Sequence, residues 1–193
     1  MDFDLLGWFK SIKLGPDIRM FFINTLFDST FVLLGIVVGS AFVETPELKV
    51  ILGTMLVSSL SLGISTGVSV YEAESLGQEM KLKKLEKAML TDLHDTQVAK
   101  AMQTTTAVIS IVNFLTPLFV CSISISPFLF SLLGIIKIST AAWVSIATAL
   151  GILFTAGFYI EVGNKKMAIF KGIKMAIFGA AAFLIGFGIE LLI

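Results

Sequence analysis

Hydrophobic residues recur along the chain in five long runs, and each run is nearly free of charge. The runs cover residues 20–43, 50–71, 101–125, 138–160 and 175–193. About 20 apolar residues cross a bilayer as a helix, so the pattern predicts five transmembrane helices. The third run continues without charge to Ile136, but Pro117 and Pro127 interrupt it. Because proline removes a helical hydrogen bond, we expect this helix to end near Ser124, with residues 126–137 forming a wet or re-entrant turn.

The first run carries polar and small residues on one helical face. Asn24, Asp28, Gly35 and Gly39 recur at steps of four, seven and four residues. Small residues four apart let membrane helices approach closely. A charged side chain at the bilayer centre costs about 2.5–3.5 kcal/mol on insertion scales. Since packing needs no carboxylate, we interpret Asp28 as an ion ligand or a proton carrier.

The second run carries a polar stripe at helical spacing, formed by Thr54, Ser58, Ser61, Ser65, Ser69 and Glu72. The first two helices run antiparallel, and a rise of about 1.5 Å per residue places Ser61 and Ser65 near the depth of Asp28. The pattern predicts a transport pathway with the members Asn24, Asp28, Ser58, Ser61, Ser65 and Thr66. The alternative is packing, because Ser and Thr in membrane helices commonly bond their own backbone carbonyls. Gly63 and Gly67 lie beside the stripe, so we expect both spans to form the core of a two-fold dimer.

Composition agrees with an integral membrane protein. Hydrophobic residues make up 56% of the chain, mean hydropathy is +0.95 and only 15% of residues are charged, against about 25% in soluble domains. The net charge of zero leaves no overall field for nucleic acid. The single cysteine, Cys121, excludes an internal disulfide and a cysteine-based zinc site. No nucleophile, base and orienting group converge, so an enzyme is not expected.

The distribution of Lys and Arg predicts the orientation. Twelve of the 14 lie before residue 20, between residues 72 and 100, or between residues 161 and 174, and the other two are Lys49 and Lys137. Cytoplasmic loops carry the excess of positive charge. We therefore expect a cytoplasmic N-terminal segment (1–19), two transmembrane helices (20–71), a cytoplasmic helical linker (72–100), three further transmembrane helices (101–193) and an external C-terminus.

The short linker is predicted to be an amphipathic helix, with Leu82, Leu85 and Met89 on one side. Its acidic residues suggest a metal site. Glu72, Glu79 and Glu86 are seven residues apart, which is about 10 Å along a helix, so no two of them chelate one ion unaided. A tighter group consists of Glu86, Met89, Asp92 and Asp95. Carboxylates with a thioether suit a divalent cation such as Fe(II) or Mn(II). Alternatively, these acids balance neighbouring lysines through helical pairs.

Several segments resemble one known family. The sequences FDSTFVLLG at 27–35 and LGISTGVSVY at 62–71 are similar to the first two spans of the vacuolar iron transporter family. FLTP at 114–117 is similar to that family's third-span Leu-Leu-Pro, and GAAAFLIG at 179–186 to its small-residue last span. The likeness covers nearly the whole chain.

The resemblance implies a five-span homodimer that moves ferrous iron or manganese out of the cytosol in exchange for protons, along a path at the dimer interface. The metal is the transported substrate, and no permanently bound cofactor is implied. Asp28 matches the family's first-span aspartate.

The chain also departs from the family pattern. Ser29 stands where the family has glycine, Thr66 where it has methionine, and Ser58 where it has an acidic residue. The linker is shorter than the family's metal-binding domain and lacks its paired glutamates. Two other functions therefore remain open, which are transport of a different solute on the same fold and a structural or assembly role in the membrane.

Overall fold

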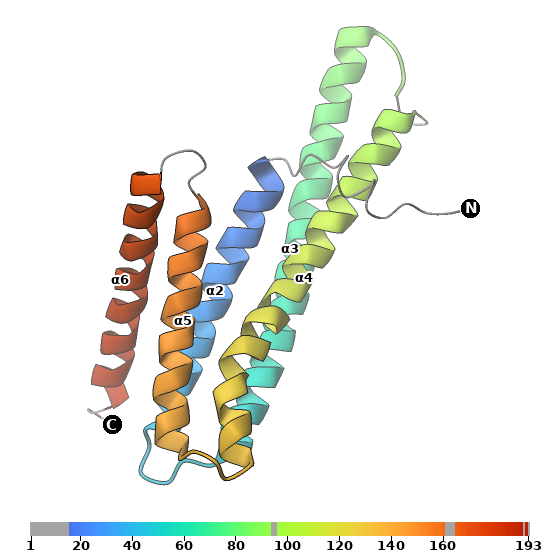
Figure 1. Cartoon of the computed structure of the whole chain (residues 1–193). Helices are drawn as coiled ribbons and strands as arrows, with labels where there is room; N and C mark the ends of the chain where they lie inside the picture. Colours follow the sequence, from blue (N-terminus) through green and yellow to red (C-terminus); the bar gives the residue numbers. More distant parts are fainter. Residues whose placement is uncertain (1–15, 94–95, 161–164, 191, 193) are drawn as a thin grey trace.

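The computed structural model describes residues 16–93, 96–160, 165–190 and 192. Its helices are α2 (Pro16–Ala41), α3 (Leu48–Met89), α4 (Gln97–Leu132), α5 (Ile138–Ile160) and α6 (Lys165–Glu190). Each contains a stretch long and apolar enough to cross a membrane, which confirms an all-α fold with five candidate spans. The start of α2, the tip of the α3–α4 hairpin, the end of α5 and the start of α6 lie toward one end of the molecule, and the end of α6 lies at the other (Figure 1). The N-terminal interfacial segment predicted from sequence falls mainly on residues 1–15, outside the described residues.

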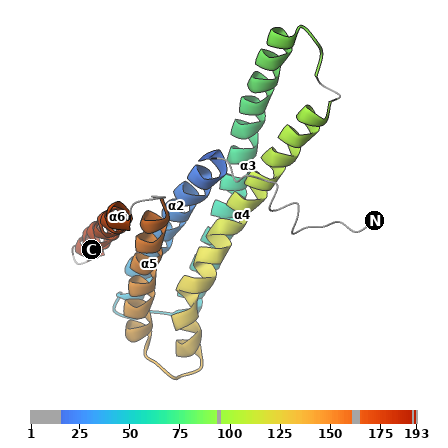
Figure 2. The same cartoon turned by 45° about the horizontal axis from the view of Figure 1, so that its top comes forward.

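Two helices are far longer than a bilayer requires. α3 has 42 residues and α4 has 36, or about 63 and 54 Å at 1.5 Å per residue, against a hydrocarbon core of about 30 Å. Their surplus length forms a hairpin that projects beyond the other helices (Figures 1 and 2).

Residues 72–89 of the predicted helical linker continue α3 without a break. Only one of the three linker residues expected on a common apolar side is buried. Leu82 packs with Leu93 and Ala99 on the α4 side of the hairpin, whereas Leu85 and Met89 are exposed. The helix buries a narrow seam against α4 instead of a broad face.

α4 also continues where its end was predicted. The helix passes through both prolines to Leu132, so the expected turn at residues 126–137 is wrong except at its end. Pro127 has no N–H and leaves the carbonyl of Ile123 without its helical donor. The Ser126 hydroxyl donates to that oxygen at 2.7 Å. A local side chain replaces the missing bond, and the chain turns only after Leu132.

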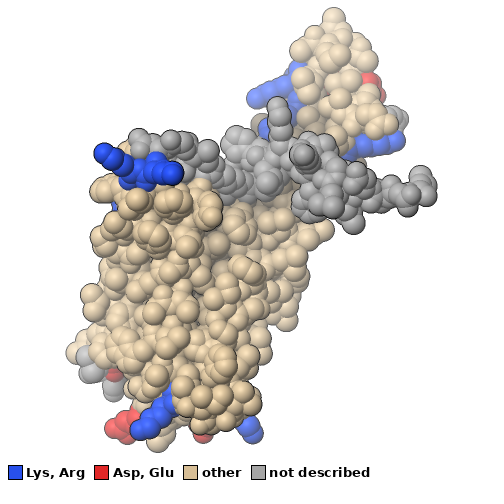
Figure 3. Space-filling model, in the orientation of Figure 1, with Lys and Arg blue, Asp and Glu red and all other residues tan. Residues whose placement is uncertain are grey.

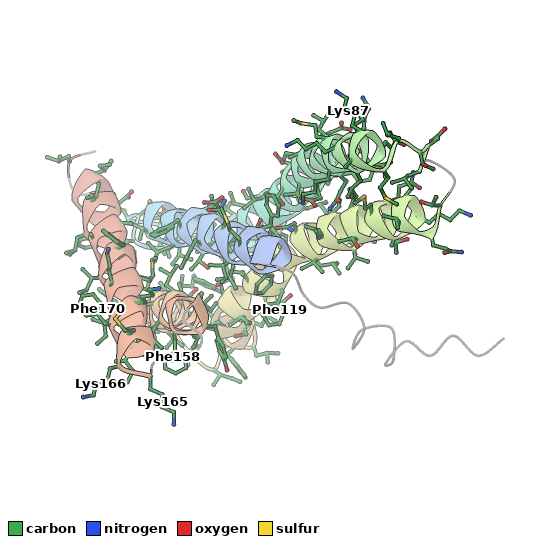
Figure 4. The ribbon with its side chains drawn as sticks, turned by 90° about the horizontal axis from the view of Figure 1, so that it is seen from above. Lys87, Phe119, Phe158, Lys165, Lys166 and Phe170 are labelled. Carbon is green, nitrogen blue, oxygen red and sulfur yellow. The ribbon has the colours of Figure 1, made fainter. Side chains whose placement is uncertain are left out.

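α2 is the central helix, in contact with every other described helix. Its buried side contributes Leu26, Leu33 and Val37 to a core shared with α3, α4 and α5. α6 lies at the edge and packs on α5, where a Cβ on Gly157 would lie 2.8 Å from the Lys171 carbonyl oxygen. Seen from above, Phe170 on α6 and Lys87 on the hairpin lie at opposite edges of the bundle (Figure 4).

The outer surface has a wide uncharged band. On the face shown in Figure 3, Lys, Arg, Asp and Glu gather at the two ends, and other residues fill the space between them. Large exposed side chains on that surface include Val57, Ile111, Phe119, Ile177 and Leu184. This pattern suits helices whose outer sides contact lipid.

Candidate functional site

One face of the central helix α2 is open and polar. Asn24 and Asp28 are exposed, as are Gly35 and Gly39. A Cβ placed on either glycine would meet no atom within 4 Å. Asp28 makes no hydrogen bond or ion pair with any residue that the structure describes. The face that the sequence predicted on the first span is thus present, and it has no partner within the described part of the monomer.

The stripe predicted on the second span is also on the surface. Thr54, Ser61, Ser65, Ser69 and Glu72 are exposed on α3, and Ser58 is partly buried. Some of its hydroxyls bond their own helix, since Ser69 donates to the Ser65 carbonyl at 2.7 Å and Thr54 to that of Val50. These bonds agree with the packing alternative for Thr54 and Ser69. The Ser61 hydroxyl makes no such bond among the described residues.

Cross-helix hydrogen bonds fix the relative depth of α2 and α3. The Thr25 hydroxyl on α2 donates to Oδ1 of Asn113 at 2.5 Å. The Thr66 hydroxyl on α3 lies 3.2 Å from the backbone oxygen of Asn113, and its shorter hydrogen bond, at 2.8 Å, goes to the Leu62 carbonyl of its own helix. Thr25 and Thr66 therefore lie at one level. Asp28 is three residues further along α2, about 4.5 Å at the helical rise. In the antiparallel α3, that level falls between Ser61 and Ser65, as the sequence predicted.

The second pair of glycines does not face outward. A Cβ on Gly63 would lie 2.6 Å from the Phe114 carbonyl oxygen, and one on Gly67 would lie 3.0 Å from the Phe114 Cβ. The Ser110 hydroxyl also donates to the Gly67 carbonyl at 2.7 Å. The prediction that Gly63 and Gly67 form a dimer face is therefore wrong, because they bring α3 against α4 within one monomer. Thr66 lies on this same internal side.

Sequence reasoning missed Asn113. Its side chain is fully buried, its Nδ2 donates to the Ile109 carbonyl at 2.8 Å, and its Oδ1 accepts from Thr25. The available signal was a lone amide in an apolar run, four residues before Pro117. A proline at that spacing frees the carbonyl of Asn113, which marks the position for contact with another helix.

The linker acids are spread along the hairpin. Glu72 is exposed, Glu79 pairs with Lys83 at 2.6 Å, and the Glu86 carboxylate accepts the Leu93 N–H at 3.0 Å. The hydrogen bond from Lys83 to Glu79 raises the pKa of Lys83 above its ordinary value.

The predicted linker metal site cannot be assembled from the described residues alone. Met89 and Asp92 are exposed, and Asp95 lies outside the described residues. Among those that are described, no group of three or more His, Cys, Asp or Glu side chains is placed to hold a metal ion. The set Glu86, Met89, Asp92 and Asp95 stays a prediction.

Sequence reasoning also missed Glu74. Its side chain is buried on α3, and one carboxylate oxygen accepts a 2.6 Å hydrogen bond from Nε2 of Gln78. A single buried carboxylate with an amide partner is a structural pair rather than a metal centre, because it supplies too few ligands.

Comparisons with known proteins add one distant relative. The chain is 24% identical over 173 residues to an uncharacterised protein of Methanocaldococcus jannaschii, covering 88% of this chain and 87% of the other. No family model matches the chain, and no solved structure matches it. The similarity thus covers most of the length of both chains. It assigns no function, so the function is argued from the residues of the site.

Proposed function

We propose that the protein is an integral membrane transporter, working as a homodimer, that moves a divalent metal cation out of the cytosol in exchange for protons. The cation we propose is ferrous iron or manganese, as the resemblance to the vacuolar iron transporter family implies. The observation that carries the proposal is the carboxylate of Asp28, which has no partner among the described residues and lies on an open face of the central helix.

An exposed carboxylate in this position needs a partner. Asp28 lies two turns inside an apolar stretch that begins at Met20, where contact with lipid would be costly. The same face carries Gly35 and Gly39, whose lack of side chains leaves room for another helix. A second copy meeting this face about a two-fold axis would enclose two Asp28 carboxylates and the hydroxyls of both α3 stripes. Such a path is lined by oxygen ligands, which divalent cations bind.

The lysines supply the orientation. Within the described residues, those on the hairpin and on α6 near its start lie at one end, and Lys49 and Lys137 lie at the other. By the positive-inside rule the hairpin end is cytoplasmic, which makes the C-terminus external. Glu72 then lies at the cytoplasmic opening of the stripe and offers the first carboxylate to a cation leaving the cytosol.

Exchange follows from the chemistry of a carboxylate in a low-dielectric site. A divalent cation binds the ionised carboxylate, so its arrival at a protonated carboxyl group displaces the proton. Metal binding and proton release are then two sides of one event. Release of the metal on the other side lets Asp28 take up a proton again.

The test is the substitution Asp28→Asn, which keeps the shape of the side chain and removes its charge. Purified protein in liposomes, with a pH-sensitive dye inside, is exposed to Mn(II). We expect metal-dependent proton movement in the wild type and none in Asp28→Asn, with an unchanged elution volume in gel filtration. Glu44→Gln is the matched control, because Glu44 is an exposed carboxylate in the loop after α2. Wild-type flux in Asp28→Asn would contradict the mechanism.

A second candidate is a structural or assembly role. It is favoured by the absence of a metal-ligand group among the described residues of one monomer and by hydroxyls of the α3 stripe that bond their own helix. Calorimetric titration with Mn(II) separates the two, because a structural protein binds no stoichiometric divalent cation.

A further inference from the structure

Among the described residues, one side-chain hydrogen bond joins the helix that carries Asp28 to another helix. The Thr25 hydroxyl donates to Oδ1 of Asn113 at 2.5 Å, and the two residues are 4% and 0% exposed. The other hydroxyls of α2 in the described part of the chain bond carbonyls of α2 itself, as Ser29, Thr30 and Ser40 do. The other contacts of α2 that the structure describes are apolar packing, which does not specify rotation as strictly as a directional bond does.

The backbone of Asn113 lacks one of the usual hydrogen bonds of α4. Pro117 has no N–H, so the carbonyl of Asn113 lacks its usual donor four residues on. The Thr66 hydroxyl of α3 lies 3.2 Å from this oxygen, and its shorter hydrogen bond, at 2.8 Å, goes to the Leu62 carbonyl of α3 itself. The side chain of Asn113 therefore contacts α2 while its backbone contacts α3. One residue of α4 ties three helices together at the level of the Asp28 site.

Two other buried threonines show that this arrangement is specific. Thr30 on α2 and Thr116 on α4 are 0% and 2% exposed. Each donates to the carbonyl four residues earlier in its own helix, at 2.7 Å. That is the ordinary use of a threonine in a membrane helix. Thr25 instead donates across to α4.

We propose that Thr25 and Asn113 are positioning residues that fix the rotation of α2, and with it the direction in which Asp28 projects. Asp28 follows Thr25 by three residues, or about 60° around the helix and 4.5 Å along it. Loss of the bond lets α2 rotate and carries Asp28 away from the α3 stripe. The role given to Asp28 rests on the proposed function, whereas the rotation of α2 does not.

The first experiment measures that rotation without reference to transport. In a Cys121→Ala background, a cysteine is placed at Asn24, which is exposed, or at Leu26, which is 8% exposed on the opposite side of α2. The rate of reaction with N-ethylmaleimide in detergent is measured for each. The labelling ratio is the rate at position 24 divided by the rate at position 26. It falls when α2 rotates and the buried position becomes accessible.

The variants compared in this assay are Thr25→Val, Thr25→Ser and Thr30→Val. Interhelical hydrogen bonds in membrane proteins average about 0.6 kcal/mol and reach about 1.7 kcal/mol, which converts to about three-fold to eighteen-fold. We expect Thr25→Val to lower the ratio by a factor in that range. Thr25→Ser, which keeps the hydroxyl, and Thr30→Val, which removes a hydroxyl bonded within α2, should leave it unchanged. An unchanged ratio in Thr25→Val overturns the proposal, and Thr25→Ala repeats the test if the valine variant is poorly folded.

The second experiment follows Mn(II)-dependent proton movement in liposomes for the same variants with Asp28 intact. We expect Thr25→Val to raise the half-saturating Mn(II) concentration about three-fold or more, with rescue in Thr25→Ser. If the wild-type protein shows no metal-dependent proton movement, the proposed function is wrong. The positioning role is then still decided by the labelling ratio. A lowered ratio with an unchanged half-saturating concentration shows that the rotation of α2 does not set the site, which overturns the link to Asp28.

Discussion

The two glycine pairs of this protein have the same spacing and opposite uses. On α3, a Cβ at Gly63 would lie 2.6 Å from the Phe114 carbonyl oxygen, so α3 and α4 meet almost backbone to backbone. On α2, a Cβ added at Gly35 or Gly39 would have no atom within 4 Å. Both pairs lie within an apolar stretch, where association depends on close packing more than on hydrophobic burial.

The difference shows what a small-residue pair specifies. A small-residue pair allows another helix to approach the backbone closely. The pair does not determine which helix approaches, or whether that helix belongs to the same chain. The pair on α3 is already occupied within the monomer. The pair on α2 shares its open face with Asp28, and under the proposed function a second copy of the chain fills the space.

The largest expected effect comes from filling the occupied pair. Gly63→Ala places a methyl group 2.6 Å from a backbone oxygen, which cannot move without displacing α4. We expect a loss of about 3 kcal/mol or more, at the upper end of overpacking costs, measured as a lower unfolding temperature in detergent. The matched control is Gly53→Ala on the same helix, where the methyl meets nothing within 4 Å. If both variants unfold alike, the α3–α4 contact is looser than described.

Filling the open pair should affect association and spare the monomer. Gly35→Leu combined with Gly39→Leu adds side chains to free space, so we expect the unfolding temperature of the monomer to be kept and dimerisation to be lost. Light scattering coupled to gel filtration measures the mass. Gly151→Leu on α5, also with nothing within 4 Å, is the control. A fully dimeric double variant would place the dimer contact elsewhere.

The third prediction tests the hydroxyl that reinforces the occupied pair. The Thr66 hydroxyl lies 3.2 Å from the Asn113 carbonyl oxygen that Pro117 leaves free and 2.8 Å from the Leu62 carbonyl oxygen of its own helix. We expect Thr66→Val to cost about 0.6 kcal/mol, the average for such bonds. In a Pro117→Ala background the restored N–H satisfies the same carbonyl, so Thr66→Val should then cost nearly nothing. Equal costs in both backgrounds, in a double-mutant cycle of unfolding free energies, would contradict the assigned partner.

The sequence predicted the five candidate spans because length and charge exclusion depend only on local composition. It also predicted which residues share a face on α2 and on α3, since helical phase decides which residues lie on one side. It failed where a local side chain replaced a lost backbone bond and where the choice of a partner helix was needed. Ser126 restores the bond lost at Pro127, so the expected break in α4 does not occur. The partner of Gly63 and Gly67 depends on which helix arrives, and no pattern within α3 encodes that choice.

The smallest expected effect lies at an exposed ion pair on the part of α3 beyond the apolar stretch. Lys83 and Glu79 form an ion pair one turn apart, with side chains 61% and 52% exposed. Their hydrogen bond raises the pKa of Lys83, so its stabilising contribution is present at neutral pH and is lost as pH rises through that pKa. Exposed pairs contribute little to stability, and we expect the effect in the pKa rather than in the unfolding temperature.

Glu79→Gln should lower the pKa of Lys83 toward its ordinary value, measured by NMR titration of the lysine side chain, whereas Glu72→Gln, eleven residues from Lys83, should not change it. The same titration tests Glu79 as a metal ligand. A divalent cation that binds Glu79 must take the carboxylate from Lys83 and place a like charge beside it, and both changes lower the pKa of the lysine. We therefore expect Mn(II) to reproduce the effect of Glu79→Gln in the wild type. A pKa that does not respond to Mn(II) would remove Glu79 from the metal ligands and leave it as the partner of Lys83.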